Sequence, residues 1–260
     1  MTHRVGHLDR RRLLAAGAAA GGLALAGRAG AAGPQQVIKT MSLLARKPDQ
    51  SHQEFMTYWL AIHALLGRAL PNLRGLICTE ITGATNQRTD IATAGDVQID
   101  GIAQIWSVPN AKPTIDERRW YGDRAHFAGQ IRDFQVQETE FVRPPRGGKG
   151  LVSVITRKPK DSHENFVKHW LGVHGPMASQ VPEVAGLVLD EVIASADPPD
   201  VARLPGLEDV DGIAESWHKD TSYAAVTSPE AKRWYADGAD LIGLARGYYT
   251  QEHVIIDPAG

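Results

Sequence analysis

Histidine and aromatic residues recur at helical spacing in two stretches of the sequence. When each stretch is placed on a helix with about 100° per residue, these side chains fall on one face. Such a face usually packs into a core, but an inward-facing imidazole needs hydrogen-bond partners, and enzymes use histidine most often for proton transfer. We therefore predict acid or base chemistry on a small carbonyl or lactone compound. The candidate catalytic residues are His52, His63, His163 and His174.

Two interpretations of these histidines stay open. His52 and His163 stand at the first position of predicted helices, where each either begins the helix beside its cap or acts as a base toward a ligand. His63 and His174 lie in mid-helix beside tryptophans, and their rings either bind a backbone carbonyl in the core or transfer protons. Four further histidines have no counterpart in the other stretch and carry little weight: His126, His169, His218 and His253.

Aromatic residues supply the candidate pocket walls. Trp106 and Trp217 fall on predicted strands, where they belong either to the core or to a pocket. Tyr121 and Tyr235 can each donate a hydrogen bond to an oxyanion, although a core or surface position explains them equally well. The candidate substrate-binding residues are Trp59, Trp106, Tyr121, Trp170, Trp217 and Tyr235.

The aspartates near these aromatic residues are expected to be structural. Asp100 and Asp211 each precede a glycine, which is typical of a turn. Asp123 and Asp237 follow the Trp-Tyr pairs, and we expect them to face solvent or to cap a helix. None of the four is a candidate catalytic residue on the sequence alone.

The sequence offers little to hold a metal ion or a nucleotide. Its one cysteine, Cys78, excludes a disulfide framework and a thiolate zinc cluster. His52 and His63 share a helix face but lie about 16 Å apart along it, too far to bind one ion. There is no His-Glu-x-x-His motif, no glycine-rich phosphate loop and no Gly-x-Ser-x-Gly motif. We expect no metal and no cofactor.

The paired histidines lie in a sequence that contains an internal duplication. The Arg-Lys-Pro at residues 46–48 recurs at 157–159, and the Asp-Gly-Ile-Ala at 100–103 recurs at 211–214, both at an offset of 111 residues. Farther along, one three-residue insertion increases the offset to 114. With two copies and a period this long, the pattern favours two related units over a solenoid.

Each copy has the pattern strand, helix, strand, strand, helix, strand. Ser51 with Glu54 forms a capping box at the start of the first helix, and Ser162 with Asn165 is a weaker version. The order predicts an α+β fold in which an antiparallel sheet carries both helices on one face, the ferredoxin-like βαββαβ layout. The predicted strands are 37–44, 73–82, 101–107 and 134–142, then 151–156, 184–194, 212–218 and 248–256.

A lone sheet of this kind leaves its other face bare, so we expect the two copies to cover each other. The copies span residues 37–142 and 150–256, and the Pro- and Gly-rich segment 143–149 links them. The polar loops 84–99 and 195–210 are predicted to form pocket rims.

Spaced motifs present in both copies resemble the EthD family. They are Ser-His-x-x-Phe-x-x-x-Trp-x-x-x-His, then Pro-x-x-x-Gly-Leu, then Asp-Gly-Ile-Ala with a Trp after two more residues. The resemblance implies a dimeric α/β-barrel, closed here within one chain, with a substrate cavity between the first helix and the sheet. It also implies kinship with cofactor-independent isomerases, monooxygenases and cyclases, and more distantly with haem-binding barrels.

Residues 1–31 predict an export signal. Three arginines precede an uncharged run from Leu13 to Gly27, and Ala29-Gly30-Ala31 fits a cleavage site. The arginines followed by two leucines resemble a twin-arginine (Tat) signal, which implies a periplasmic or secreted protein. The alternative is a transmembrane anchor, but the run is shorter than the roughly 20 residues that span a bilayer. The arginines are Arg10, Arg11 and Arg12.

Composition narrows the choice of partners. Without residues 1–31 the chain carries 23 basic and 29 acidic residues, which disfavours nucleic acid and anionic membranes and leaves a small-molecule ligand. We expect first an exported cofactor-independent enzyme with oxidoreductase, isomerase or cyclase chemistry. The alternatives are a non-catalytic small-molecule-binding or accessory protein and a haem-binding barrel with a helix histidine as ligand. Pairing of two chains into a homodimer is compatible with each.

Overall fold

The computed structural model describes residues 36–85, 91–93, 97–110, 112–220 and 227–258. Residues 36–260 form one compact unit. The predicted export signal lies outside the described residues. Among the helices that the structure describes, none is long and apolar enough to cross a membrane.

Eight antiparallel strands close into a barrel, because β1 pairs with β3 on one side and with β4 on the other. The order around the barrel is β1, β3, β2, β9, β5, β8, β6, β4. A short β7 (Ala202–Arg203) adds a parallel pairing to β4. The barrel strands are β1 (Ile38–Arg46), β2 (Leu73–Thr85), β3 (Gly101–Ser107), β4 (Ala128–Val142), β5 (Lys149–Arg157), β6 (Val184–Ala196), β8 (Gly212–His218) and β9 (Ile242–Ile256).

The barrel consists of two halves with the same strand order. The first half runs β4-β1-β3-β2 and the second runs β9-β5-β8-β6. The halves meet at two seams: the first seam pairs β2 with β9, and the second seam pairs β4 with β6. Each seam therefore joins residues that are far apart in the sequence.

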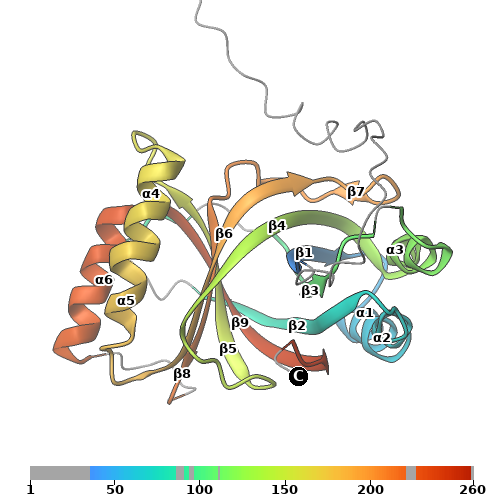
Figure 1. Cartoon of the computed structure of the whole chain (residues 1–260), viewed down its shortest axis with the longest axis horizontal. Coiled ribbons are helices and arrows are strands. Elements are labelled where there is room, and N and C mark those ends of the chain that lie inside the picture. The colour runs from blue at the N-terminus through green and yellow to red at the C-terminus, as the bar shows by residue number, and fades with distance from the viewer. Residues whose placement is uncertain (1–35, 86–90, 94–96, 111, 221–226, 259–260) are drawn as a thin grey trace, which may run out of the picture. The chain divides into compact units, whose positions relative to one another are not determined.

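Two helices cover the outside of each half (Figure 1). In each half, the first of these helices is interrupted by a π-helical turn. It comprises α1 (His52–Tyr58), η3 (Trp59–His63) and α2 (Ala64–Arg68), and its counterpart comprises α4 (His163–His169), η4 (Trp170–His174) and α5 (Gly175–Ala178). The second helices are α3 (Ile115–Phe127) and α6 (Pro229–Leu241). The predicted capping box at Ser51 and Glu54 is present.

Alternation along the strands divides the core into three parts. On β1, Met41 and Leu43 face the barrel interior, whereas Leu44 faces the helices of the first half. The third cluster lies between the second sheet and its helices and includes Phe166 and Trp170. A chemical site can therefore lie inside the barrel or in either layer between helices and sheet.

The predicted third strands, 101–107 and 212–218, match β3 and β8. The fourth strands begin earlier than predicted, at Ala128 and Ile242, because α3 and α6 pass into β4 and β9 without an intervening turn. The segment 195–210, which was predicted to form a pocket rim, contributes to the core of the barrel. Its Leu204 and Leu207 are buried with the barrel-interior residues.

Candidate active site

The first dyad consists of His63, at the end of η3, and Asp123 in α3. His63 Nδ1 lies 2.8 Å from Asp123 Oδ2, and the Tyr58 hydroxyl donates to Asp123 Oδ1 at 2.9 Å. Trp120 stacks on the His63 ring, and its indole N–H donates to the His63 carbonyl oxygen at 3.0 Å. The ring is therefore held on three sides. Asp123 does not simply face solvent or cap a helix, contrary to expectation.

The surroundings determine the protonation of His63. Burial lowers its pKa to about 4, and this outweighs the opposite effect of Asp123. At neutral pH the ring is uncharged. Because a carboxylate only accepts hydrogen bonds, Nδ1 carries the proton and Nε2 keeps a lone pair. Among the residues that the structure describes, Nε2 has no hydrogen-bond partner.

A small closed cavity lies beside His63, between the helices and the first sheet. Its volume is about 10 Å³, the room of roughly one water molecule. Trp59, Tyr121 and Ser42 line it, and the Ser42 hydroxyl is buried without a hydrogen-bond partner. Cys78 also lines it, but burial raises the pKa of this thiol far above neutral, so Cys78 is no thiolate nucleophile. An acceptor nitrogen and a free hydroxyl therefore share one enclosed space.

Arg124 also lines this cavity. Its Nη1 lies 3.0 Å from Asp133 Oδ2, and its guanidinium lies 4.9 Å from the Tyr121 ring centroid. Burial raises the pKa of Tyr121, so its hydroxyl stays a hydrogen-bond donor. The sequence reasoning missed Arg124 and Asp133. The signal that could have found them is that these two charged residues occupy positions where the other copy has Gly238 and Gly247.

The second dyad consists of His174 and Asp237 in the other half. His174 Nδ1 lies 2.8 Å from Asp237 Oδ2, and His169 Nε2 lies 2.8 Å from the other oxygen. Although burial acts in the opposite direction, these two histidines lower the pKa of Asp237. His169 thus takes the place that Tyr58 has in the first half, which corrects the low weight given to it.

His52 and His163 lie away from the dyads, at the starts of α1 and α4. His52 Nδ1 lies 3.1 Å from Asp100, and His163 Nδ1 lies 2.8 Å from Asp211. Both aspartates are buried, and each also accepts hydrogen bonds from the backbone and side chain of an arginine, Arg46 or Arg157. Asp100 and Asp211 therefore orient histidines as well as forming turns.

The candidate tryptophans fall on two sides of the sheets. Trp59 and Trp170 pack in the layers between helices and sheets. Trp106 and Trp217 face the barrel interior, on either side of the Arg146 guanidinium at 5.8 and 5.2 Å. Tyr235 stacks on Trp234 in the second half. Of the candidate residues, the cavity brings together Trp59, His63 and Tyr121.

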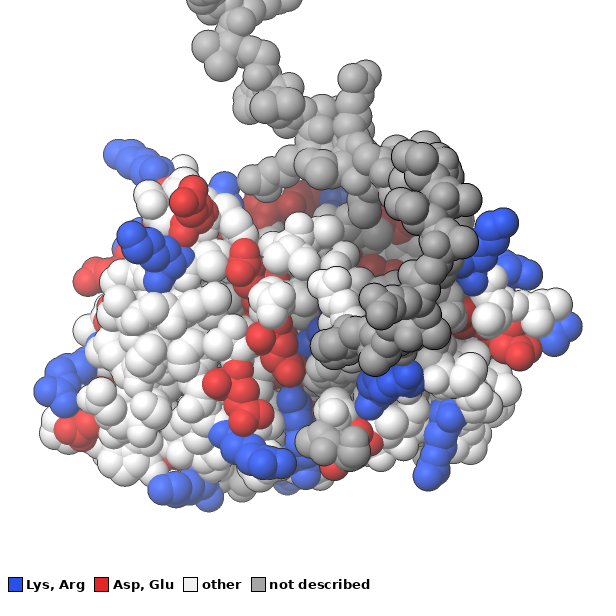
Figure 2. Space-filling view, in the orientation of Figure 1, with Lys and Arg blue, Asp and Glu red and all other residues white. Residues whose placement is uncertain are grey.

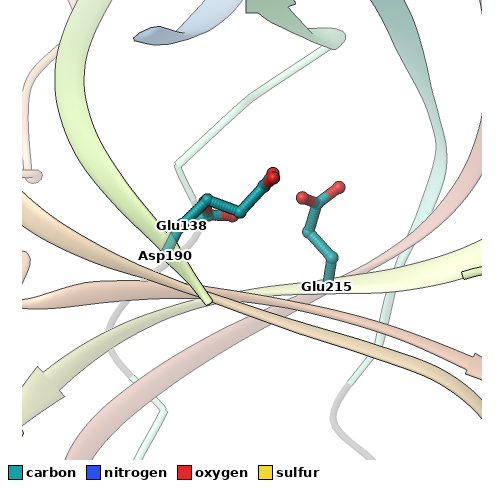
Figure 3. A group of neighbouring side chains, drawn as sticks. All are labelled: Glu138, Asp190 and Glu215. Carbon is teal, nitrogen blue, oxygen red and sulfur yellow. The ribbon is translucent and has the colours of Figure 1, made fainter. Parts of the chain in front are cut away.

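An acidic cluster inside the barrel was not expected from the sequence. Carboxyl groups from β4, β6 and β8 converge there (Figure 3). Lys39 Nζ lies among them, 2.6 Å from Glu138, 3.0 Å from Asp190 and 2.9 Å from Glu215. Despite the opposing effect of burial, these carboxylates raise the pKa of Lys39. The ammonium group already occupies the position that a metal ion would need.

Haem binding by the first half would need a histidine ligand beside a pocket of sufficient size. Any helix-side ligand in the first half would be His63, which lines a cavity of about 10 Å³. A porphyrin needs a space of the size of a small-molecule pocket, several hundred Å³. The cavity beside His63 is therefore too small for haem.

Comparison with solved structures identifies the same architecture. An anthrone oxidase-like protein aligns with a TM-score of 0.51 and 12% identity over 86% of this chain and 95% of its own. A candidate monooxygenase from Lactobacillus acidophilus NCFM aligns with a TM-score of 0.50 and 10% identity over 83% of this chain and 93% of its own. At such identities the likeness concerns the fold, that of the dimeric α/β-barrels. Comparison with curated proteins gives no match.

Comparison with protein families gives a specific result. The EthD domain profile matches residues 47–117 and again residues 158–245, one segment in each half. Both dyad histidines lie within the matched segments. The chain therefore belongs to the EthD domain family.

Proposed function

We propose that the protein is a small-molecule enzyme in which His63 is the general base. The observation that carries this proposal is the uncharged His63 ring, whose Nε2 has no partner among the described residues and which lines a small cavity together with Ser42, whose hydroxyl is likewise unpartnered there. A buried imidazole oriented by a carboxylate is the arrangement that proton abstraction needs, because the carboxylate stabilises the imidazolium that forms.

The reaction that fits is removal of a proton from carbon next to a carbonyl group. Nε2 of His63 takes the proton, and the Ser42 and Tyr121 hydroxyls donate to the enolate oxygen. Return of the proton at another carbon gives an isomerisation. In the oxidation, O₂ adds to the carbanion and is protonated to a hydroperoxide, which loses water and leaves a new carbonyl group on that carbon. The names of the structural neighbours favour oxidation of an anthrone-type ketone. No cofactor takes part in the proton transfer.

Substrate entry requires the cavity to enlarge. Its present volume is about 10 Å³, and Arg124 with Asp133 stands at its edge. Movement of the Arg124 side chain away from Tyr121 opens the layer without disturbing the sheet. Arg124 then meets the incoming carbonyl oxygen with its guanidinium.

The test is turnover of anthrone, followed by O₂ uptake and by the absorbance of anthraquinone. Replacement of His63 by Gln is expected to lower kcat about 100-fold or more, since general bases contribute at least that much. Asp123→Asn is expected to lower it similarly, because the amide favours the wrong tautomer. The variant His174→Gln measures the share of the second half. Full activity of His63→Gln with any substrate found would overturn the proposal.

A second candidate function is ligand holding without turnover. It is favoured by the small size of the cavity and its mostly apolar walls, to which Trp59, Trp120 and Phe127 contribute. In that case ligands bind, but neither dyad replacement changes their chemistry. The charge distribution fits either function, because acidic and basic side chains are interspersed on the face that Figure 2 shows.

We also propose that residues 1–31 direct export by the Tat route and that each half is a ferredoxin-like unit. The arginines at positions 10 and 11 and the two leucines after Arg12 support the first statement. The strand order repeated in both halves supports the second. Replacement of Arg10 and Arg11 by Lys is expected to retain the protein in the cytoplasm with residues 1–31 uncleaved, as measured by fractionation and intact mass.

A further inference from the structure

A pocket of about 590 Å³ opens at the first seam, where the two halves meet. Its volume is within the range of roughly 300–1,000 Å³ found for small-molecule sites. The end of β2, the start of β9 and residues 97–100 form its walls, and His52 stands at its edge. Buried Ile81, Ile99 and Tyr248 provide an apolar surface. The pocket is separate from the cavity beside His63.

His52 is held at the wall of this pocket by two carboxylates. Its Nδ1 lies 3.1 Å from Asp100 Oδ1, and its Nε2 lies 3.2 Å from Glu80 Oε1. Carboxylates only accept hydrogen bonds, so both contacts are satisfied together when both ring nitrogens carry protons. Buried Asp100 is itself fixed by Arg46 and Gln98. The ring therefore presents an N–H toward Glu80 with a defined direction.

Glu80 is shared between two histidines from the two halves. Its Oε1 faces His52, and its Oε2 lies 3.0 Å from His253 Nε2 on β9. A ligand group that enters between His52 and Glu80 leaves Glu80 with His253 as a partner. A hydroxyl suits this place, since it accepts from the His52 N–H and donates to the Glu80 oxygen at the same time.

The second seam has an equivalent histidine, but an arginine forms a hydrogen bond across this seam. His163 lies 2.8 Å from Asp211 and 3.4 Å from Glu191, as His52 does with its partners. There Arg132 reaches across the seam and donates to the Ser195 hydroxyl at 2.7 Å. The position that matches Ser195 in the first seam is Ala84, which has no hydroxyl to hold an arginine.

We propose that the first-seam pocket binds a phenol, a hydroxylated aromatic compound whose hydroxyl lies between His52 and Glu80. The aromatic body packs on Ile81 and Tyr248. The neutral hydroxyl matches a wall lined by two arginines and two carboxylates, Arg46, Arg246, Asp100 and Glu80. This inference does not depend on the chemistry of the first dyad.

The test is calorimetric titration of the purified protein with 2-naphthol and with 2-methoxynaphthalene, which lacks the donor hydrogen. We expect one 2-naphthol per chain and about tenfold weaker binding of the methyl ether, the effect of losing one hydrogen bond to a charged group. His52→Gln is expected to weaken 2-naphthol about tenfold and to weaken the ether as well, because the ether oxygen can still accept from the His52 N–H. His163→Gln, the matched control at the second seam, is expected to change neither.

A second variant tests whether the compounds bind in this pocket, and it changes no charged residue. Ala84→Phe fills the pocket from an exposed strand position and is expected to abolish binding of both compounds. Absence of 2-naphthol binding, an equal effect of His163→Gln, or unchanged binding in His52→Gln would each overturn the proposal. So would loss of binding in His63→Gln with retention in His52→Gln, because the phenol would then occupy the dyad cavity. Normal binding in an inactive His63→Gln protein separates the two proposals.

Discussion

The two halves of the barrel share a framework and differ in what surrounds it. Both place a histidine at the end of a π-helical turn, 2.8 Å from an aspartate of the next helix. The differences lie at the other oxygen of that aspartate, where Tyr58 corresponds to His169, and at the cavity edge, where Arg124 corresponds to Gly238. The two halves thus share the pairing that orients a histidine, and the residues around that pairing differ.

The two halves also contribute different residues to the barrel interior. Lys39 of the first half has Gly150 as its counterpart, and it binds carboxylates of both halves. Arg146 of the linker supplies the second cation, 2.8 Å from Glu252. One half therefore carries the ammonium that neutralises acids contributed mainly by the other. The fused chain can specialise in this way, whereas two identical chains could not.

The largest effect is expected when Lys39, which binds carboxylates of both halves, is replaced. Lys39→Met removes the partner of three carboxylates, and we expect the free energy of unfolding to fall by about 3–5 kcal/mol in urea titrations. Arg146→Met is the comparison, and a smaller loss is expected because its side chain is partly exposed and Glu252 keeps a hydrogen bond from Gly147. Adding Asp190→Asn and Glu215→Gln to Lys39→Met should restore much of the loss. A change below about 1 kcal/mol in Lys39→Met would show that the cluster does not join the halves.

Acid stability provides the next test. The pKa of His63 is about 4 in the folded chain, against 6.5 for an unperturbed histidine, so the unfolded state binds more protons between these values. The resulting stability is fully present above pH 6.5 and is lost as the pH falls toward 4, in total about 3 kcal/mol. His63→Gln should flatten this part of the pH dependence of the free energy of unfolding. An unchanged slope in that variant would contradict the assigned environment.

Two glycines test the shared framework. A Cβ at Gly101 would lie 2.3 Å from the Trp59 ring, and one at Gly212 would lie 2.4 Å from the Trp170 ring. We expect Gly101→Ala and Gly212→Ala each to cost about 1–3 kcal/mol by overpacking, and to similar extents, in thermal or urea unfolding. The control is Gly122→Ala, which meets no atom within 4 Å and matches Ala236 of the second half; it should be neutral or stabilising. Clearly unequal costs would mean that the halves do not share this packing.

The smallest effect is expected where the halves substitute for each other. Tyr58→His gives the first half the residue of the second, and both side chains can bind the outer oxygen of the dyad aspartate. We expect the free energy of unfolding, derived from the midpoint, to change by less than about 1 kcal/mol, the size of one partly exposed hydrogen bond. A loss above about 2 kcal/mol would show that Tyr58 has a role that His169 lacks.

The repeat in the sequence predicted most of the fold. The offset of 111 residues located strands 101–107 and 212–218, and the resemblance to the EthD family implied the barrel that the structure shows. The sequence pattern located the ends of the helices less well. α3 ends at Phe127 and β4 begins at Ala128, so no turn residues mark the passage from helix to strand, and Gly129 lies within the strand.

The candidate site was harder to predict than the fold. Periodicity along one helix located His63, but Asp123 lies 60 residues away and meets it only because α3 packs beside η3. Arg124 and Asp133 differ in type from their counterparts Gly238 and Gly247, but the sequence does not show that they pair, since the pairing depends on the bend from α3 into β4. The barrel-interior cluster combines residues from β1, β4, β6 and β8, and no local pattern announces it. The roles predicted for Tyr235, Trp106 and Trp217 stay predictions.

The most direct test of the account is an NMR titration of the His63 side chain with ¹⁵N-labelled imidazole. We predict an uncharged ring with its proton on Nδ1 and a bare Nε2 at neutral pH, and a titration midpoint near 4. Asp123→Asn in the same experiment should alter the tautomer signal, which assigns it to the dyad. A ring that titrates near 6.5, or one with its proton on Nε2 at neutral pH, would contradict the claim that His63 is a general base poised in the first half.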